Sequence, residues 1–326
     1  MSEQPTGALP AVERSARERS ARGLPAVAVI GTGRMGAAMV GRLRSAGAEV
    51  VVYNRTASRA QEVAAATGAT VAASAAEAAS AAPVVLVSLA DDQAVMAAYG
   101  GPEGIAAGVS ARTVVADTST VDPRTVARAA ELLAGRGGRL LDTPVSGSVP
   151  AVQQGTLIVL AGGEAADLEQ ARPVLDVLAR QIFHLGHSGA GAVMKLAVNT
   201  LVHALNQALS EALVLAEKAG IDRGLAYDVI TASAAGAPFV QYKRTHFEYP
   251  EQAPVAFTLE LVAKDLALAL ALAERVGVGL PQAQVNHETA SQAIRAGLGQ
   301  RDMAELATLI RGSGLAIPDS GQSSSR

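Results

Sequence analysis

Residues 27–36 read VAVIGTGRMG, a short β-branched apolar run that passes through three glycines into a helical segment. In a doubly wound α/β fold the first glycine allows a tight strand-to-helix turn. The second lets a pyrophosphate approach the backbone, and the third lets the helix pack against the strand. An amphipathic helix over 37–46 and a second strand over 49–53 supply the context that this motif requires. The segment therefore predicts a dinucleotide-binding domain whose ligand contacts Gly31, Thr32, Gly33, Arg34, Met35 and Gly36.

The second strand ends in Asn54, Arg55 and Thr56, and these residues bear on which dinucleotide binds. A chain that prefers NAD usually carries Asp or Glu about 20 residues beyond the glycines, to accept from the ribose 2′-hydroxyl. No carboxylate stands there to repel a 2′-phosphate, and Arg55 offers a planar fork of donors, with Arg59 one helical turn on. We therefore predict a preference for NADP(H). The alternative is that Arg55 is a solvated residue at a helix start and both cofactors bind.

Apolar strand candidates alternate with helical stretches through the first half of the chain. Several are apolar on both faces, as in strands that helices cover on both sides. This alternation predicts an α/β fold with an N-terminal, Rossmann-type doubly wound sheet, in which sites lie at the carboxyl ends of the strands. The candidates are 27–30, 50–53, 84–89, 113–117, 140–145, 156–161 and 182–185, and the ends are 31–36, 54–56, 89–92, 117–120 and 145–147.

After Gly191 the pattern becomes helical and no strand signal returns. We predict an all-helical C-terminal domain joined to the first by a long inter-domain helix over 192–219. Because this helix is apolar on nearly all sides, we expect it to be buried between domains and in the subunit interface of a homodimer or homotetramer. Further helices are expected over 223–233, 259–276, 282–296 and 303–310. The expected divisions are a mobile tail over 1–24, the NADP-binding domain over 25–188, a helical substrate and dimerisation domain over 189–312, and a disordered tail over 313–326.

The composition limits which metals, macromolecules and membranes the protein is expected to bind. The 326 residues include no cysteine, which excludes disulfides and thiolate metal sites, and the five histidines lack zinc-binding spacing, so we expect no metal. The net charge of −3 gives no reason to expect a nucleic acid. Charges interrupt the alanine-rich helices too often for a membrane span, and the first two dozen residues lack the apolar run of a secretory signal. We expect a cytoplasmic protein that acts on a small molecule.

Only four of the 27 basic residues are lysines, which makes each lysine a candidate for proton chemistry that arginine cannot perform. Lys195 lies one turn into the long helix, and Asn199 follows on the same face. We interpret Lys195 as a general acid that Asn199 orients. From spacing alone, a snorkelling lysine that caps a buried helix explains the position equally well. His203, Asn206 and Ser210 continue the face as a polar stripe, which is also compatible with interhelical hydrogen bonds.

The motifs together resemble the β-hydroxyacid dehydrogenase family, which includes 3-hydroxyisobutyrate dehydrogenase. After VIGTGRMG and NRT they arrive in the family's order and cover nearly the whole chain between the tails. They are DTSTVDP at 117–123, DTPVSGSVPAVQQGTL at 142–157, GHSGAGAVMKLAVN at 186–199 and KDL at 264–266. The resemblance implies an NADPH-dependent reduction of a small aldehyde or keto acid, of the semialdehyde or glyoxylate type, to the hydroxy acid.

The resemblance also implies roles for single residues. Lys195 would be the catalytic lysine with Asn199 as its partner, and Lys264 would close over cofactor and substrate with Asp265 beside it. From the residues alone, Ser119 is also explained as a strand-end cap and Lys264 as a surface lysine. We give His187 no chemical role, and residues 237–242, with Pro238, Phe239 and Val240, are only guesses for the substrate pocket. The remaining implied contacts are Ser119 and Thr120 near nicotinamide and substrate, Ser146 and Gly147 at the substrate carboxylate, and Leu89 and Ala90 along the cofactor.

One loop departs from the family pattern. Ser148 replaces the second glycine of the usual SGG, and Val149–Pro150 follows. This pair and Asp91–Asp92 resemble imine reductases, a sister family, although those usually carry Asp or Tyr at the position of Lys195. An enzyme that acts on cyclic imines or on carbonyls without a carboxylate is therefore the alternative. An NADP-sensing protein without turnover is a third hypothesis, against which the Lys195–Asn199 pair speaks. 6-Phosphogluconate dehydrogenase shares the architecture but has a longer helical domain.

Overall fold

The computed structural model of the protein describes residues 23–312, so the predictions for residues 1–22 and 313–326 lie outside it. The chain divides into two compact units that meet in the sequence after Lys195. The first unit is built on a six-stranded parallel sheet with the order β3-β2-β1-β4-β5-β6. Its strands are β1 (Val27–Ile30), β2 (Val50–Tyr53), β3 (Thr70–Val71), β4 (Val84–Val87), β5 (Val114–Asp117) and β6 (Arg139–Asp142).

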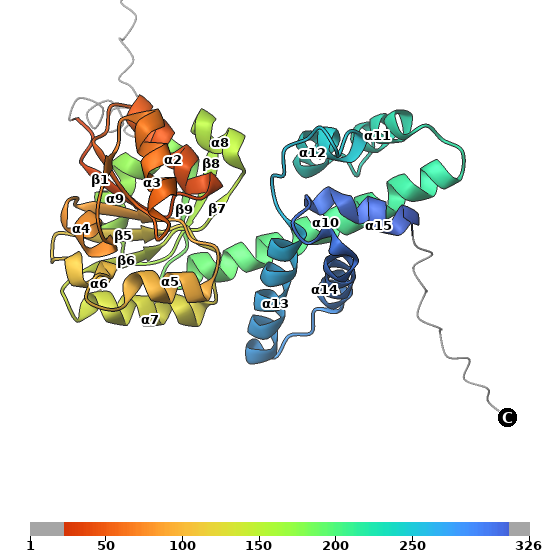
Figure 1. Cartoon of the computed structure of the whole chain (residues 1–326). Coiled ribbons are helices and arrows are strands. Elements are labelled where there is room, and N and C mark those ends of the chain that lie inside the picture. Colours follow the sequence, from red (N-terminus) through yellow and green to blue (C-terminus); the bar gives the residue numbers. More distant parts are fainter. Residues whose placement is uncertain (1–22, 313–326) are drawn as a thin grey trace, which may run out of the picture. The chain divides into compact units, whose positions relative to one another are not determined.

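Helices cover both faces of this sheet, which explains the continuous apolar strands. Along β1, Val27 and Val29 pack into the core on one face, whereas Ala28 and Ile30 pack into the core on the other. Figure 1 shows α2 and α3 on one side of the sheet and α5, α6 and α7 on the opposite side. The predicted Rossmann-type sheet is confirmed. The helices are α2 (Arg34–Ser45), α3 (Ala57–Thr67), α4 (Ala75–Ser80), α5 (Asp92–Tyr99), α6 (Ile105–Gly108), α7 (Pro123–Ala134), α8 (Val149–Gln154) and α9 (Ala165–Leu178).

The last strands form a separate sheet, which corrects the prediction of one continuous sheet. This three-stranded sheet has the order β7-β8-β9, with β7 antiparallel and β9 parallel to β8. The predicted strand over 140–145 is wrong as one element, because the chain leaves β6 at Asp142 and re-pairs at Val145 with Val159. The strands are β7 (Val145–Ser146), β8 (Leu157–Ala161) and β9 (Ala179–His184).

The second unit is helical, with a core drawn from several helices and from the segment that contains Met303. The long helix α10 (Ala190–Lys218) enters it from the first unit's last residues. In the single chain α10 is not covered on all sides, because Leu201 is 64% and Leu215 is 72% exposed, and its burial in a subunit interface stays a prediction. The helix α12 was not predicted. The further elements are α11 (Arg223–Ala232), α12 (Pro238–Glu248), α13 (Leu259–Val276), α14 (Pro281–Ala293), the short turns η1 (Ile294–Leu298) and η2 (Met303–Glu305), and α15 (Leu306–Gly312).

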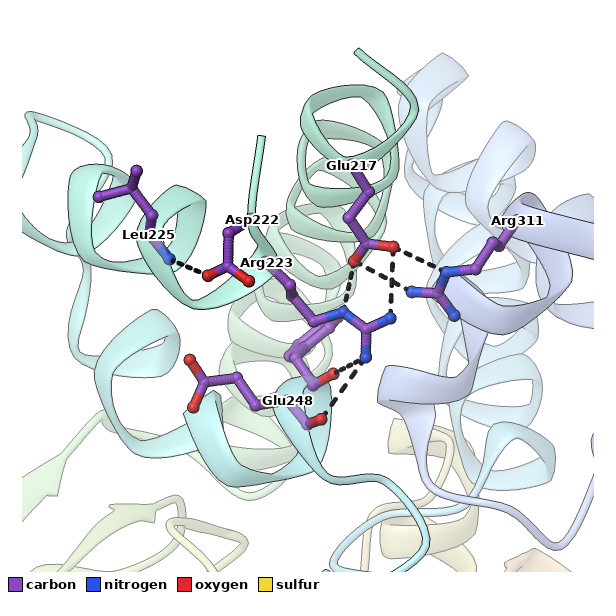
Figure 2. A network of polar contacts seen from close by, with 7 residues as sticks. Glu217, Asp222, Arg223, Leu225, Glu248 and Arg311 are labelled. Carbon is purple, nitrogen blue, oxygen red and sulfur yellow. Dashed lines mark hydrogen bonds and ion pairs between the residues drawn. The ribbon is translucent and has the colours of Figure 1, made fainter. Parts of the chain in front are cut away.

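A charged cluster joins the end of α10 to α11, α12 and α15 (Figure 2). The Glu217 carboxylate accepts from Arg223 Nε at 2.5 Å and from Arg311 Nε at 2.8 Å, and Arg223 also donates to the Phe247 carbonyl. Partial burial pushes the pKa of the Glu217 carboxyl upward, but hydrogen bonds from Arg311 and Arg223 outweigh it and hold the pKa below its usual value. The cluster therefore fastens three helices to the end of α10.

Candidate active site

Two glycines of the loop over 31–36 are required by packing within the protein, and the third is not. A Cβ on Gly36 would lie 1.9 Å from the Gly31 carbonyl oxygen, and one on Gly31 would lie 2.3 Å from the Ser88 carbonyl oxygen, so the fold itself needs both glycines. A Cβ on Gly33 would have no atom within 4 Å. Since no packing of the protein excludes a side chain at Gly33, the open space at the N-terminus of α2 fits the approach of a dinucleotide pyrophosphate.

Asn54 links the glycine loop to the end of β2. Its Oδ1 accepts from the Thr32 amide at 3.1 Å, and its Nδ2 donates to the Thr56 carbonyl at 3.0 Å. The predicted residues 32 and 54–56 are thereby brought together at the carboxyl ends of adjacent strands. Arg34 and Met35 begin α2 beside them.

A cavity of about 380 Å³ opens beside this loop at the end of β2. Arg55 lines it, whereas Arg59 is exposed and is not among its lining residues. None of the lining residues is a carboxylate. Sequence reasoning missed part of the wall, because the two-residue strand β3 gives no periodic signal. The lining residues are Tyr53, Asn54, Arg55, Ala57, Ala60, Gln61, Val71, Ala72 and Ala73.

Ser119 follows β5 and is held from both sides. Its Oγ accepts from the Leu89 amide at 2.9 Å, which ties the end of β5 to the end of β4, and its amide donates to Asp117 Oδ1 at 2.9 Å. Tyr99, fully buried on α5, donates from its hydroxyl to Asp117 Oδ2 at 2.9 Å. The Ser119 side chain also hydrogen-bonds the Asp117 carboxylate. Ala90 and Thr120 lie beside these residues, exposed and half-buried.

Burial dominates the electrostatics of this group. It raises the pKa of the Asp117 carboxyl, and the hydrogen bonds from Ser119 and Tyr99 oppose that rise only in part. Burial first, and then the nearby Asp117 charge, raises the pKa of the Tyr99 hydroxyl well above its usual value. Tyr99 therefore remains a hydrogen-bond donor across the physiological pH range.

The predicted carboxylate-binding loop follows β7. Ser146 is the last residue of that strand, and Gly147 has a φ of 132°, a conformation that favours glycine. A Cβ on Gly147 would lie 2.7 Å from Leu157 Cδ2. Ser148 is the N-cap residue of α8 and Val149 begins that helix. The departure from the family pattern thus occurs at a short helix start.

The start of α10 is anchored by Asp142 at the end of β6. Asp142 Oδ1 accepts from the Gly189 amide at 2.7 Å and Oδ2 accepts from the Ala192 amide at 2.8 Å. Burial raises the pKa of the Asp142 carboxyl, and these amide donors oppose the rise. Lys195, half-buried, comes one turn after Ala192, so the helix that carries it is fixed at its base.

In the second unit, Asn199 meets the KDL motif. Asn199 Nδ2 donates to Asp265 Oδ2 at 2.5 Å, and Lys264 Nζ forms an ion pair with Asp265 Oδ1 at 2.9 Å. The Asp265 side chain is 1% exposed and that of Lys264 is 21% exposed, so Lys264 is more than a plain surface lysine. Three predicted residues thus form one cluster, in which Asp265 orients the Asn199 amide.

Other predicted residues have structural positions. Asn206 Nδ2 donates to the Met303 carbonyl at 2.9 Å and so fastens α10 to η2, whereas Ser210 Oγ donates to the Asn206 carbonyl at 2.7 Å within α10 itself. Phe239 and Val240 are buried in the helical core, so each has a packing role there, and their place in a substrate pocket stays a prediction. His187 is exposed and contacts the Ser188 carbonyl.

Within residues 23–312, no group of three or more His, Cys, Asp or Glu side chains is arranged to hold a metal ion. In the same part of the chain no helix combines the length and the apolar character that crossing a bilayer requires.

Comparison with known proteins follows the division of the chain. Residues 26–186 match the NAD-binding domain of 6-phosphogluconate dehydrogenase, and residues 189–310 match the NAD-binding domain of NADP-dependent 3-hydroxyisobutyrate dehydrogenase. Glyoxylate/succinic semialdehyde reductase 1 of Arabidopsis thaliana is 34% identical over 285 residues, which cover 87% of this chain and 98% of that protein.

Solved structures of similar enzymes have the same fold as this chain. A 3-hydroxyisobutyrate dehydrogenase of Mycobacterium tuberculosis with L-serine is 30% identical, with a TM-score of 0.77 and coverage of 88% of this chain and 99% of that one. An imine reductase from Pseudomonas sp. has a TM-score of 0.59 at 20% identity, covering 88% and 99%, which shows a shared fold alone.

The fold, the glycine loop and these matches define an oxidoreductase that binds a nicotinamide cofactor and acts on small-molecule substrates with CH–OH chemistry. The chain belongs to the β-hydroxyacid dehydrogenase family. The resemblance stated from the motifs is thereby confirmed.

Proposed function

We propose that the protein is an NADPH-dependent reductase that converts a small aldehyde or keto acid to the hydroxy acid. The observation that carries the proposal is the Asn199–Asp265–Lys264 cluster one helical turn beyond Lys195. A reductase needs a donor fixed beside the substrate oxygen, and a buried carboxylate that fixes the Asn199 amide meets that need. The relative named as a glyoxylate/succinic semialdehyde reductase supports this substrate class.

The proposed division of labour is simple. The reduced nicotinamide supplies a hydride. Lys195 donates a proton to the carbonyl oxygen as negative charge develops there, and Asn199 orients that oxygen. A positioned general acid contributes about 10²–10⁴-fold to the rate. Ser119 is proposed to hold the substrate, and Ser146 and Gly147 are proposed to bind its carboxylate.

A pair of lysine variants tests the assignment of Lys195. We expect Lys195→Met to lower kcat for succinic semialdehyde or glyoxylate by about 10²–10⁴-fold while the Kd of NADPH stays near that of the parent. Lys218→Met is the matched control, since it removes a lysine from the exposed end of the same helix. A Lys195→Met enzyme with parental kcat would refute the general-acid role.

The preference for NADPH is proposed from Arg55 and from a cavity wall without carboxylates. Charge-assisted hydrogen bonds to a phosphate are worth about 1.5–3 kcal/mol, so Arg55→Ala should raise the KM for NADPH by about 10–100-fold and barely change that for NADH. Arg59→Ala, which alters an arginine outside the cavity wall, is the control. Equal catalytic efficiency of the parent enzyme with both cofactors would contradict the proposal.

Imine reduction is the second candidate, because Val149 and Pro150 begin α8 where the family has a glycine-rich loop. The acidic pair Asp91–Asp92 gives imine reduction less support, because both carboxylates already bind backbone amides. Asp91 Oδ1 accepts from the Ala94 amide, and Asp92 Oδ1 accepts from the Asp122 amide. Parallel assays with succinic semialdehyde, glyoxylate and a cyclic imine separate the two reactions. Turnover of the imine alone would replace the first proposal, and tight NADPH binding without any turnover would favour the sensor hypothesis.

We also propose a homodimer or homotetramer. Exposed leucines on α10, Leu201 and Leu215, give this helix an uncovered apolar surface in the single chain. Light scattering coupled to size-exclusion chromatography should report a mass at least twice 32.9 kDa. A monomer at micromolar concentration would contradict this.

A further inference from the structure

His203 is a buried imidazole that the proposed chemistry does not use. It lies on α10 one turn beyond Asn199, and its side chain is 2% exposed. Neither ring nitrogen has a hydrogen-bond partner among residues 23–312. Buried polar groups are nearly always satisfied, so this one calls for an explanation.

The ring lies next to the site cluster. His203 Nε2 is 3.8 Å from Asp265 Oδ2, the same oxygen that accepts from Asn199 Nδ2 at 2.5 Å. That distance is too long for a hydrogen bond, and a small rotation of either side chain would close it. We propose that His203 is a positioning residue, whose protonation state sets how firmly Asp265 holds Asn199 and Lys264.

The charged groups around the ring define what protonation would do. From α13, His203 faces the Asp265 carboxylate, whose other oxygen is paired with Lys264. From the segment before α13, the ring of Phe257 packs at 5.7 Å between centroids. The Phe257 amide in turn donates to Asp302, which pairs with Lys243 and lies near His246.

The two protonation states of His203 act differently on Asp265. When the His203 ring is neutral, the Asp265 carboxylate keeps its hydrogen bond from Asn199 and its ion pair with Lys264. An imidazolium would form a charge-assisted hydrogen bond to Asp265 Oδ2 and compete directly with Asn199 for that oxygen. Its positive charge would also reduce the attraction between Asp265 and Lys264.

Kinetics supply the first test, which rests on the proposed reductase function. Weakening one such hydrogen bond corresponds to about a fivefold loss of rate, so protonation of His203 should lower kcat/KM of the parent by about fivefold or more on the acid side of its pH profile. His203→Gln keeps a neutral donor near the Nε2 position and cannot be protonated. This variant should retain near-parental kcat/KM at neutral pH and should not show the parental fall in kcat/KM at acid pH. His287→Gln, at a half-buried histidine on α14, should keep the acid limb. A His203→Gln profile identical to the parental one would overturn the proposal.

A spectroscopic test is independent of turnover. In the full chain labelled with ¹⁵N, the side-chain amide signal of Asn199, assigned with Asn199→Asp, should shift with pH at the same midpoint as the ring signals of His203. In His203→Phe, which keeps a ring against Phe257, that amide signal should be independent of pH over the same range. An Asn199 amide signal that ignores the protonation of His203 in the folded parent would overturn the proposal. If no substrate is turned over but the coupled shift is present, only the reductase function fails.

Discussion

Gly33 and Gly36 offer a contrast between a glycine that a ligand needs and one that the fold needs. We consider Gly33→Ala and Gly36→Ala as a pair of variants, since each adds one methyl group to the same loop. Gly33 has φ −68° and ψ −174°, an extended conformation that any residue adopts, and its added Cβ would meet no atom within 4 Å. At Gly36 the added Cβ would lie 1.9 Å from the Gly31 carbonyl oxygen, which is backbone and cannot turn aside.

The expected magnitudes follow from those distances. For Gly33→Ala, a weaker N-cap costs up to about 1 kcal/mol, and a stiffer unfolded chain returns about 0.4–1 kcal/mol, so stability should change little. The methyl group displaces the pyrophosphate from the helix N-terminus. Losing one charge-assisted hydrogen bond of about 1.5–3 kcal/mol raises the Kd of NADPH by about 10–100-fold. Overpacking at Gly36 should lower the free energy of unfolding by about 3 kcal/mol.

Urea unfolding with and without NADPH measures both quantities. At 100 times the parental Kd, NADPH should raise the parental free energy of unfolding by about 2.7 kcal/mol. For Gly33→Ala the same concentration should add only about 0.4 kcal/mol if the Kd rises a hundredfold. Without cofactor, Gly33→Ala should unfold like the parent and Gly36→Ala at much lower urea. Parental NADPH affinity in Gly33→Ala would refute the assignment of this open space to the cofactor.

Two more predictions concern buried charges. Since the pKa of the Glu217 carboxyl is lowered in the folded state, its contribution of about 1–3 kcal/mol is present above the unfolded-state pKa and is lost as pH falls through the folded-state pKa. Glu217→Gln should therefore be less stable than the parent in urea at pH 7, and the difference should shrink as pH falls through the folded-state pKa of Glu217, whereas the exposed control Glu288→Gln should match the parent throughout. Tyr99→Phe should lower the free energy of unfolding by about 1–3 kcal/mol, because Asp117 Oδ2 loses its donor. It should also lower kcat/KM through Ser119, and an unchanged kcat/KM would show that Ser119 does not depend on Tyr99.

Strands with apolar residues on both faces were predictable, and their pairing was less so. The limits of β1 were read correctly because helices bury both faces of that strand, which makes the run apolar throughout. The run over 140–145 reads LLDTPV and is apolar only at its ends, and it serves two sheets. The Thr143 amide still donates to the Asp117 carbonyl, whereas the Pro144 carbonyl accepts from the Leu160 amide. Hydrophobicity reports burial, but it does not report which partner a strand takes.

Elements with a weak local signal were missed. The strand β3 has only two residues, and both are exposed, so no alternation of apolar and polar residues marks it. The helix α12 mixes aromatic, basic and polar residues, and Lys243 is buried on it in an ion pair with Asp302, 2.6 Å away. From sequence alone a lysine is expected at the surface, so its burial cannot be predicted until its ion-pair partner is known. The segment 71–73, which lines the cavity at the end of β2, was missed for the same reason, since it depends on β3.

The polar stripe on α10 shows where sequence reasoning about a site stops. Spacing places Asn199, His203, Asn206 and Ser210 on one face and gives no ground to separate them. Their roles differ because their partners differ. Asn206 donates to a backbone carbonyl 97 residues away and fastens helices, whereas Asn199 and His203 converge on one oxygen of Asp265, 66 residues beyond Asn199. Because Asp265 accepts from Asn199 and also faces His203, protonation of the imidazole can change the hydrogen bond that Asp265 makes to the Asn199 amide. The backbone carbonyl that accepts from Asn206 cannot do this. The chemical meaning of each position in the stripe is therefore set by α13 and η2, which only the folded chain brings against α10.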